Sequence, residues 1–274
     1  MTKDVILKRM AAEIKQNNLV LFVGAGMSAG AGLPGWADLI GPLAVDIGRA
    51  VPVPGPGFGE QLLEIAAEFE ASHGRNALVR HLRQELAGPL PLPTTTHEYL
   101  PRLLPRGVLV TTNYDELIER AYFNATVPAQ TMISDSDLPY WNGAGAQLIK
   151  LRGDINRPEG LVVTRRDYDN HPLKQPVLHQ QLTAILATRT ALFVGYSHSD
   201  PDTTMLLHRL QHQLGVHMRT WYTVQFDIST TAAQAWSRSH QGVLPFVLSS
   251  SGSTRTDALC SFLSDLHDEV KKGP

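Results

Sequence analysis

The sequence contains a single cysteine, Cys260, among its 274 residues. One thiol excludes an intrachain disulfide framework and any zinc site built from four cysteines. A surplus of positive charge is also missing, since 24 Lys and Arg residues stand against 26 Asp and Glu residues. This balance argues against a free-standing nucleic-acid-binding protein, which needs cations to neutralise phosphates.

Long hydrophobic runs are absent as well. No stretch approaches the roughly 18 to 20 consecutive apolar residues that a transmembrane helix needs. The N-terminal segment carries Asp4, Lys8, Arg9 and Glu13 where a signal peptide has its apolar region. We therefore expect a cytoplasmic protein without a membrane segment, beginning with an amphipathic helix whose apolar residues recur at helical spacing over 7–14.

Hydrophobic residues make up 43% of the chain, enough for the core of one large domain. Short apolar runs alternate with helical patterns, which is typical of βαβ units. The predicted strands are 19–23, 107–110, 148–151, 191–194, 219–224 and 242–248. The sequence thus predicts an α/β, Rossmann-like fold with a mainly parallel sheet flanked by helices.

One long segment interrupts this alternation. Residues 24–106 separate the first two predicted strands and are mostly helical in pattern. Proline-rich stretches at 51–59 and 87–95 mark loops, because proline disrupts helix interiors and central strands. We predict a single domain over 1–274 that carries a small helical insertion at about 51–106.

Polar or glycine-rich segments follow four of the predicted strands. In an open parallel sheet, ligands bind outside the carboxyl ends of the strands. The first segment, 24–36, has the sequence GAGMSAGAGLPGW, and its backbone N–H groups could hold a diphosphate. Its spacing also fits dinucleotide-dependent dehydrogenases, which place an acidic residue about 20 positions later at the end of a second strand. Asp46 has that spacing but lies in a predicted helix, so the dehydrogenase interpretation is disfavoured.

Four ordered motifs carry a family resemblance. GAG-x-S, GLPGW, TTNYDELIE and GYSHSDPD occur in this order, over roughly residues 15–250. Together they resemble the sirtuin family, and without a zinc module they are most similar to the divergent bacterial sirtuin-like domains. The resemblance implies a small helical subdomain inserted in a Rossmann-like domain, with NAD+ as substrate in the cleft between them. It also implies an NAD+ glycohydrolase that releases nicotinamide and ADP-ribose in anti-phage defence.

The resemblance carries over to individual residues on three loops. It implies that 24–28 line the diphosphate, that 33–36 lie near the nicotinamide ribose, and that 195–197 form a turn at the adenosine end. The implied NAD+-binding residues are Gly24, Ala25, Gly26, Ser28, Leu33, Pro34, Trp36, Thr112, Gly195, Tyr196 and Ser197.

Asn113 and Asp115 match the catalytic motif of the family. The resemblance implies that Asn113 positions a water molecule or the ribose hydroxyls and that Asp115 supports it. Cleavage of the nicotinamide–ribose bond develops oxocarbenium character, so a neutral amide that orients water suits the chemistry. The alternative is that both residues cap the helix predicted to follow them, and the two roles are compatible.

The third motif departs from the family pattern. Relatives have K-L-H-G, with the histidine as catalytic base, whereas this chain has Lys150-Leu151-Arg152-Gly153. Arginine stays protonated and offers no acceptor, so Arg152 cannot take a proton. Three interpretations stay open: Arg152 is an inactivating substitution, natural or introduced; the chain binds NAD+ or ADP-ribose without turnover; or Asp154 acts as the base.

Other function classes follow from the same residues. The alternative to an enzyme is a non-catalytic NAD+- or ADP-ribose-binding regulatory or scaffold subunit. Protein deacetylation is disfavoured by the missing zinc module.

His208 and His212 have the i, i+4 spacing of a zinc site, but neighbouring leucines place them beside a core stripe, so we predict no metal. The resemblance implies a homo-oligomer and a partner such as a hexameric DNA-translocating ATPase or a short Argonaute, without direct nucleic-acid binding.

Overall fold

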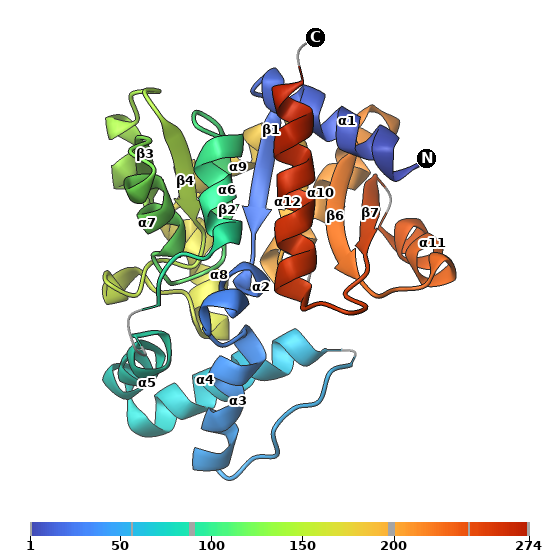
Figure 1. The fold of residues 1–274 in the computed structure, drawn as a ribbon. Coiled ribbons are helices and arrows are strands. Elements are labelled where there is room, and N and C mark those ends of the chain that lie inside the picture. Colours follow the sequence, from blue (N-terminus) through green and yellow to red (C-terminus); the bar gives the residue numbers. More distant parts are fainter. Residues whose placement is uncertain (1, 56, 88–90, 197–200, 241, 273–274) are drawn as a thin grey trace.

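A seven-stranded sheet forms the centre of the molecule in the computed structural model, which describes residues 2–55, 57–87, 91–196, 201–240 and 242–272 (Figure 1). The strand order is β3-β4-β2-β1-β5-β6-β7, and each neighbouring pair is parallel. The strands are β1 (Leu19–Val23), β2 (Val108–Thr111), β3 (Ala129–Met132), β4 (Ala146–Lys150), β5 (Thr190–Val194), β6 (Trp221–Phe226) and β7 (Val243–Leu248). The prediction of an α/β fold with a mainly parallel sheet is confirmed.

All six predicted strands are present, with small shifts at their ends. The strand that the sequence did not predict is β3, which lies at the edge of the sheet and pairs with β4. Its residues are mostly exposed or half-buried, so it lacks the apolar run that marks the central strands. By contrast, all five residues of β1 are buried, as expected for a strand covered on both faces.

Helices cover both faces of the sheet (Figure 1). One face packs against α1 (Lys3–Lys15), α6 (Thr95–Leu103), α7 (Leu117–Asn124) and α12 (Arg255–Lys271). The other face packs against α9 (Pro176–Thr188), α10 (Pro201–Leu214) and α11 (Thr230–Ser239). The amphipathic helices predicted at the two ends of the sequence are α1 and α12, each of which buries one apolar stripe.

Three further helices gather below the carboxyl ends of the strands: α3 (Trp36–Asp46), α4 (Phe58–His73) and α5 (Arg75–Ala87) (Figure 1). We call these three helices the helical module. They share an apolar cluster, which includes Leu39, Leu62 and Leu82, with neighbouring segments that contribute Tyr114 and Leu161. In contrast, α6 packs against α7 and α12. The boundaries 51–106 of an inserted subdomain stay a prediction.

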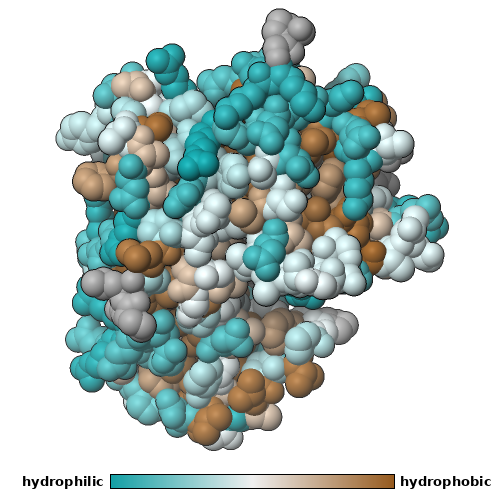
Figure 2. Space-filling view, in the orientation of Figure 1, coloured by the Kyte–Doolittle hydropathy of each residue, from teal (hydrophilic) through white to brown (hydrophobic). Residues whose placement is uncertain are grey.

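Figure 2 shows apolar surface in several places on the visible face, including the lower end of the molecule where the helical module lies. Val45 on α3 is exposed, as are Val51 and Val53 in the segment that follows this helix. The remaining short elements are α2 (Ala25–Ser28), η1 (Ala29–Ala31), η2 (Asp135–Tyr140), η3 (Pro158–Gly160), α8 (Arg165–Lys174) and η4 (Gly215–His217).

The strand order places a ligand-binding position in the middle of the sheet. β1 and β5 are neighbours, but the chain leaves β1 toward β2 on one side and leaves β5 toward β6 on the other. At such a switch point, the two loops diverge and open a crevice at the carboxyl ends of the strands. The glycine-rich segment after β1 and the turn after β5 meet there.

Candidate functional site

A cavity of about 700 Å³ lies at this switch point, between the sheet and the helical module. Its size is within the range of small-molecule and cofactor pockets. The structure brings most predicted site residues to its lining: Gly24, Ala25, Gly26, Ser28, Pro34, Trp36, Thr112, Asn113, Asp115, Arg152, Gly195 and Tyr196. Ser197 lies outside the described residues. The remaining two predicted residues, Leu33 and Asp154, do not line this cavity.

The glycines of the first loop approach the backbone of the β5 turn. The N–H of Gly24 donates to the carbonyl of Val194 at 3.0 Å, and that of Gly26 donates to the carbonyl of Gly195 at 2.9 Å. A Cβ on Gly24 would stand 2.5 Å from the carbonyl oxygen of Gly195, whose own φ is +61°. These glycines therefore allow two loops to pack together, and the two N–H groups are used within the protein rather than pointing at a diphosphate.

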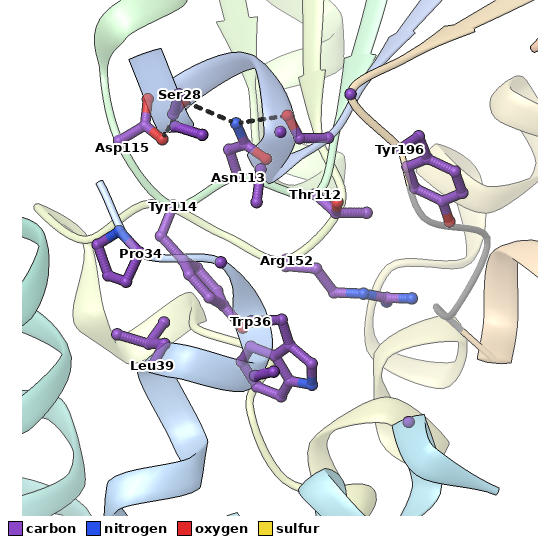
Figure 3. Close-up of a pocket in the computed structure, with 18 of the residues that line it drawn as sticks. Ser28, Pro34, Trp36, Leu39, Thr112, Asn113, Tyr114, Asp115, Arg152 and Tyr196 are labelled. Carbon is purple, nitrogen blue, oxygen red and sulfur yellow. Dashed lines mark hydrogen bonds between the residues drawn. The ribbon is translucent and has the colours of Figure 1, made fainter. Parts of the chain in front are cut away.

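Asn113 presents a buried oxygen to the cavity. Its Nδ2 donates to the carbonyl of Gly24 at 3.3 Å and to Ser28 Oγ at 3.1 Å (Figure 3). Because a carbonyl can only accept, these bonds fix the orientation of the amide. Asn113 is 6% exposed, and its Oδ1 has no hydrogen-bond partner within the described part of the chain. Such an oxygen is a ready acceptor for a water molecule or a ligand hydroxyl.

Asp115 supports both the site and the following helix. Its Oδ2 accepts from Ser28 Oγ at 2.9 Å, and its Oδ1 accepts from the backbone N–H of Leu117 at 3.0 Å. The second bond satisfies the N–H of the first residue of α7, but the N-cap residue of this helix is Glu116, and the side-chain amide of Asn113 donates to Gly24 and Ser28 instead. The first bond links Asp115 through Ser28 to Asn113. One carboxylate thus accepts a hydrogen bond from the start of α7 and, through Ser28, holds the side chain of Asn113.

Arg152, which the sequence motif predicts at the position of the family histidine, extends into the cavity (Figure 3). It is 2% exposed, and its guanidinium lies 3.9 Å from the centroid of the Tyr168 ring, a cation–π contact. Burial, then His179 and Arg152, lower the pKa of the nearby His171 to about 3, so that imidazole is neutral at pH 7. Among the described residues that line the cavity there is no histidine.

The two other predicted residues have different surroundings. Asp154 is buried, and its Oδ2 accepts from Lys150 Nζ at 2.6 Å while its Oδ1 accepts from the backbone N–H of Asn156 at 2.8 Å. Both oxygens are therefore engaged inside the protein. Leu33 packs into the apolar cluster of the helical module.

The apolar wall of the cavity was not predicted from the sequence. The helical module contributes Leu39, Phe58, Leu63 and Leu86 to this wall. Periodicity identifies buried positions on a helix, but which of them border a cavity depends on how the helices pack. Tyr114 also lines the cavity, and its place in the TTNYDELIE motif between Asn113 and Asp115 could have identified it from the sequence. Its hydroxyl donates to the carbonyl of Val162 at 2.7 Å, and its ring centroid lies 6.3 Å from that of Trp36.

Comparison with known proteins agrees with these features. Residues 107–245 match the model of a family described as a SIR2-like domain. The NAD(+) hydrolase ThsA of Acinetobacter baumannii (strain 532279) is 30% identical over 224 residues, covering 81% of this chain and 45% of the relative. The protein of the same name from Bacillus cereus (strain MSX-D12) is 29% identical over 211 residues, 76% of this chain and 43% of the relative. Defense-associated sirtuin 2 of Bacillus subtilis is 27% identical over 206 residues, 74% of this chain and 20% of the relative.

The chain spans less than half the length of these curated relatives. A solved structure described as "The Structural basis for Sirtuin Substrate affinity" superposes with a TM-score of 0.52 over 98% of both chains at 12% identity, and so shares the fold.

Within the described residues, no group of three or more His, Cys, Asp or Glu side chains is placed to hold a metal ion. None of the helices there is long and apolar enough to cross a membrane. The fold and the cavity agree with the family match, which covers just over half of the sequence. The chain belongs to the SIR2-like domain family.

Proposed function

We propose that this chain is an NAD+ glycohydrolase domain that acts in anti-phage defence. The observation that carries the proposal is the unpartnered, buried Oδ1 of Asn113 in a cavity at the switch point of the sheet. The names of the relatives, NAD(+) hydrolase and defense-associated sirtuin, support the same substrate and setting.

The reaction converts NAD+ and water to nicotinamide, ADP-ribose and a proton. The bond between the ribose C1′ and the nicotinamide nitrogen breaks, its electron pair leaves with nicotinamide, and the water oxygen bonds to C1′. Asn113 Oδ1 accepts a hydrogen bond from that water or from a ribose hydroxyl, while Ser28 and Asp115 hold the amide in place. The apolar wall limits access of other water, which strengthens the polar contacts inside.

Arg152 limits the rate at which this chain hydrolyses NAD+. A permanent cation cannot accept the proton of the water, and it opposes the positive charge that develops on the sugar. The engagement of Asp154 with Lys150 argues against Asp154 as a replacement base. We therefore expect this chain to bind NAD+ and to hydrolyse it slowly, with Arg152 contacting the diphosphate.

For regulation, we propose a homo-oligomer that responds to a partner protein, such as a hexameric DNA-translocating ATPase or a short Argonaute. The balanced charge of the chain supports detection of nucleic acid by another protein rather than by this domain.

The decisive experiment compares the chain with Arg152→His and with Arg152→His/Asn113→Ala. NAD+ loss and product release are measured by chromatography, and NAD+ affinity by calorimetry. We expect Arg152→His to release nicotinamide and ADP-ribose, and Asn113→Ala to reduce this rate by about 100-fold. Arg209→His, an exposed substitution outside the cavity, is the matched control and should leave the parent's behaviour unchanged.

Each other outcome identifies a different function. If Arg152→His binds NAD+ but stays inert, the chain is a binding subunit rather than an enzyme. If the unaltered chain hydrolyses NAD+ and Asp154→Ala abolishes this, Asp154 is the base after all. Release of a deacetylated peptide from an acylated substrate would overturn both and indicate a deacetylase.

A further inference from the structure

Lys150 is a fully buried cation directly behind the site. It is the last residue of β4, its exposure is 0%, and it does not line the cavity. Its ammonium lies 2.7 Å from the carbonyl of Asp115, 2.6 Å from Asp154 Oδ2 and 3.1 Å from Glu119 Oε1. The ammonium donates hydrogen bonds to the Asp115 carbonyl and to Asp154 Oδ2, whereas Glu119 Oε1 lies at ion-pair distance and accepts no hydrogen bond.

The three partners come from separate parts of the site. Asp115 belongs to the turn that carries Asn113, Glu119 belongs to α7, and Asp154 belongs to the loop that carries Arg152. Lys150 Nζ also lies 3.4 Å from the carbonyl of Tyr114, in the same turn. A single buried charge therefore joins the turn after β2 to the loop after β4, and each of these segments contributes a side chain to the cavity.

Burying three charged groups carries a large desolvation penalty. Burial alone would lower the pKa of Lys150, but attraction to Glu119 and Asp154 outweighs it and raises that pKa, so the ammonium stays charged. Apolar residues of similar volume often give equal or greater stability than a buried ion pair. The cluster is therefore better explained by the fixed geometry it gives to the two loops than by a gain in stability.

We propose that Lys150 is a positioning residue, whose ammonium holds the backbone of the Asn113–Asp115 turn against the loop after β4. This contact keeps Asn113 Oδ1 directed into the cavity. Lys150 acts through the backbone and through Asp154, and it touches neither substrate nor the reacting atoms. The inference depends on the proposed function only where NAD+ is used as the probe.

The test needs a variant that folds, since removing the lysine alone would leave two buried carboxylates without a counter-ion. The triple variant Lys150→Met/Glu119→Gln/Asp154→Asn removes all three charges and nearly conserves volume. Lys8→Met, an exposed substitution on α1, is the matched control. Backbone hydrogen exchange and NAD+ affinity are measured for the chain, the triple variant and the control.

We expect exchange at residues 113–117 to accelerate by about 100-fold in the triple variant, while the central strands keep their protection. NAD+ affinity should fall by about 10-fold, the effect of losing one well-placed hydrogen bond to the ligand. Unchanged protection at 113–117, or an equal loss along the whole chain, would overturn the positioning role. If the parent chain does not bind NAD+, the proposed function fails, and the exchange measurement still decides the role of Lys150.

Discussion

The two walls of the cavity are built in different ways. The polar wall consists of Ser28, Asn113 and Asp115, joined to one another by hydrogen bonds of 2.9 and 3.1 Å. The apolar wall consists of side chains from the helical module, such as Leu39 and Leu63, held by packing alone. A hydrogen-bonded wall fixes direction, whereas a packed wall fixes shape and excludes water. We therefore expect the polar wall to respond sharply to small changes and the apolar wall to respond in proportion to the volume removed.

The largest effect is expected where the polar wall meets the β5 turn. In Gly195→Ala, the new Cβ would lie 2.4 Å from the backbone nitrogen of Met27, at a φ of +61°. We expect a loss of about 4 kcal/mol in the free energy of unfolding, combining a left-handed backbone with an overlap that cannot relax. Gly252→Ala is the matched control, because its φ is +80° with nothing within 4 Å, and it should cost about 1 kcal/mol. Equal losses for the two variants in urea titrations would contradict the close packing of the loops.

A smaller effect is expected on the apolar wall. Leu63 is 1% exposed and packs with Val162 and Tyr168, so Leu63→Ala should cost about 3 kcal/mol through lost burial and a new cavity. Because the polar wall is held by its own hydrogen bonds, backbone hydrogen exchange at residues 113–117 should accelerate only as much as the lower free energy of unfolding accelerates exchange elsewhere in the chain. Leu173→Ala, at an exposed position on α8, should cost less than about 0.5 kcal/mol. Selective loss of protection at 113–117 in Leu63→Ala would show that the two walls are not independent.

The smallest effect concerns a buried histidine near the polar wall. His97, on α6, accepts a hydrogen bond at Nδ1 from the backbone N–H of Thr94 at 3.2 Å. Burial lowers the pKa of His97 to about 4, although Asp115 attracts its protonated form. Below pH 6.5 the unfolded chain takes up a proton that the folded chain accepts only near pH 4. Folding stability contributed by neutral His97 is therefore complete above pH 6.5 and lost as the pH falls toward 4.

At pH 5 this loss should reach about 2 kcal/mol relative to pH 8. His97→Asn keeps an acceptor for Thr94 but does not titrate, so its stability should fall less steeply between pH 7 and pH 5. Thermal unfolding of both forms across this range measures the difference. Identical slopes would show that His97 does not contribute to the pH dependence.

The sequence predicted the polar wall of the cavity better than its apolar wall. Asn113, Asp115 and Ser28 stand in short motifs whose spacing relates directly to chemistry, and the structure brings them within hydrogen-bond distance. The edge strand β3 was missed because it has no apolar run. Asp154 lies in a loop close to Arg152, yet its carboxylate turns toward Lys150, and sequence proximity gave no information about that direction.

By itself, the sequence determined the parallel sheet, the amphipathic helices at the N- and C-terminal ends of the chain, and the family motifs at the carboxyl edge of the sheet. It did so because hydrophobic periodicity and motif spacing are local properties of a chain. Only the tertiary structure decided that the N–H groups of Gly24 and Gly26 donate to the β5 turn, that the helical module forms an apolar wall, and that Lys150 lies behind the Asn113–Asp115 turn. These features join residues far apart in the sequence, so they depend on packing between elements rather than on any one segment.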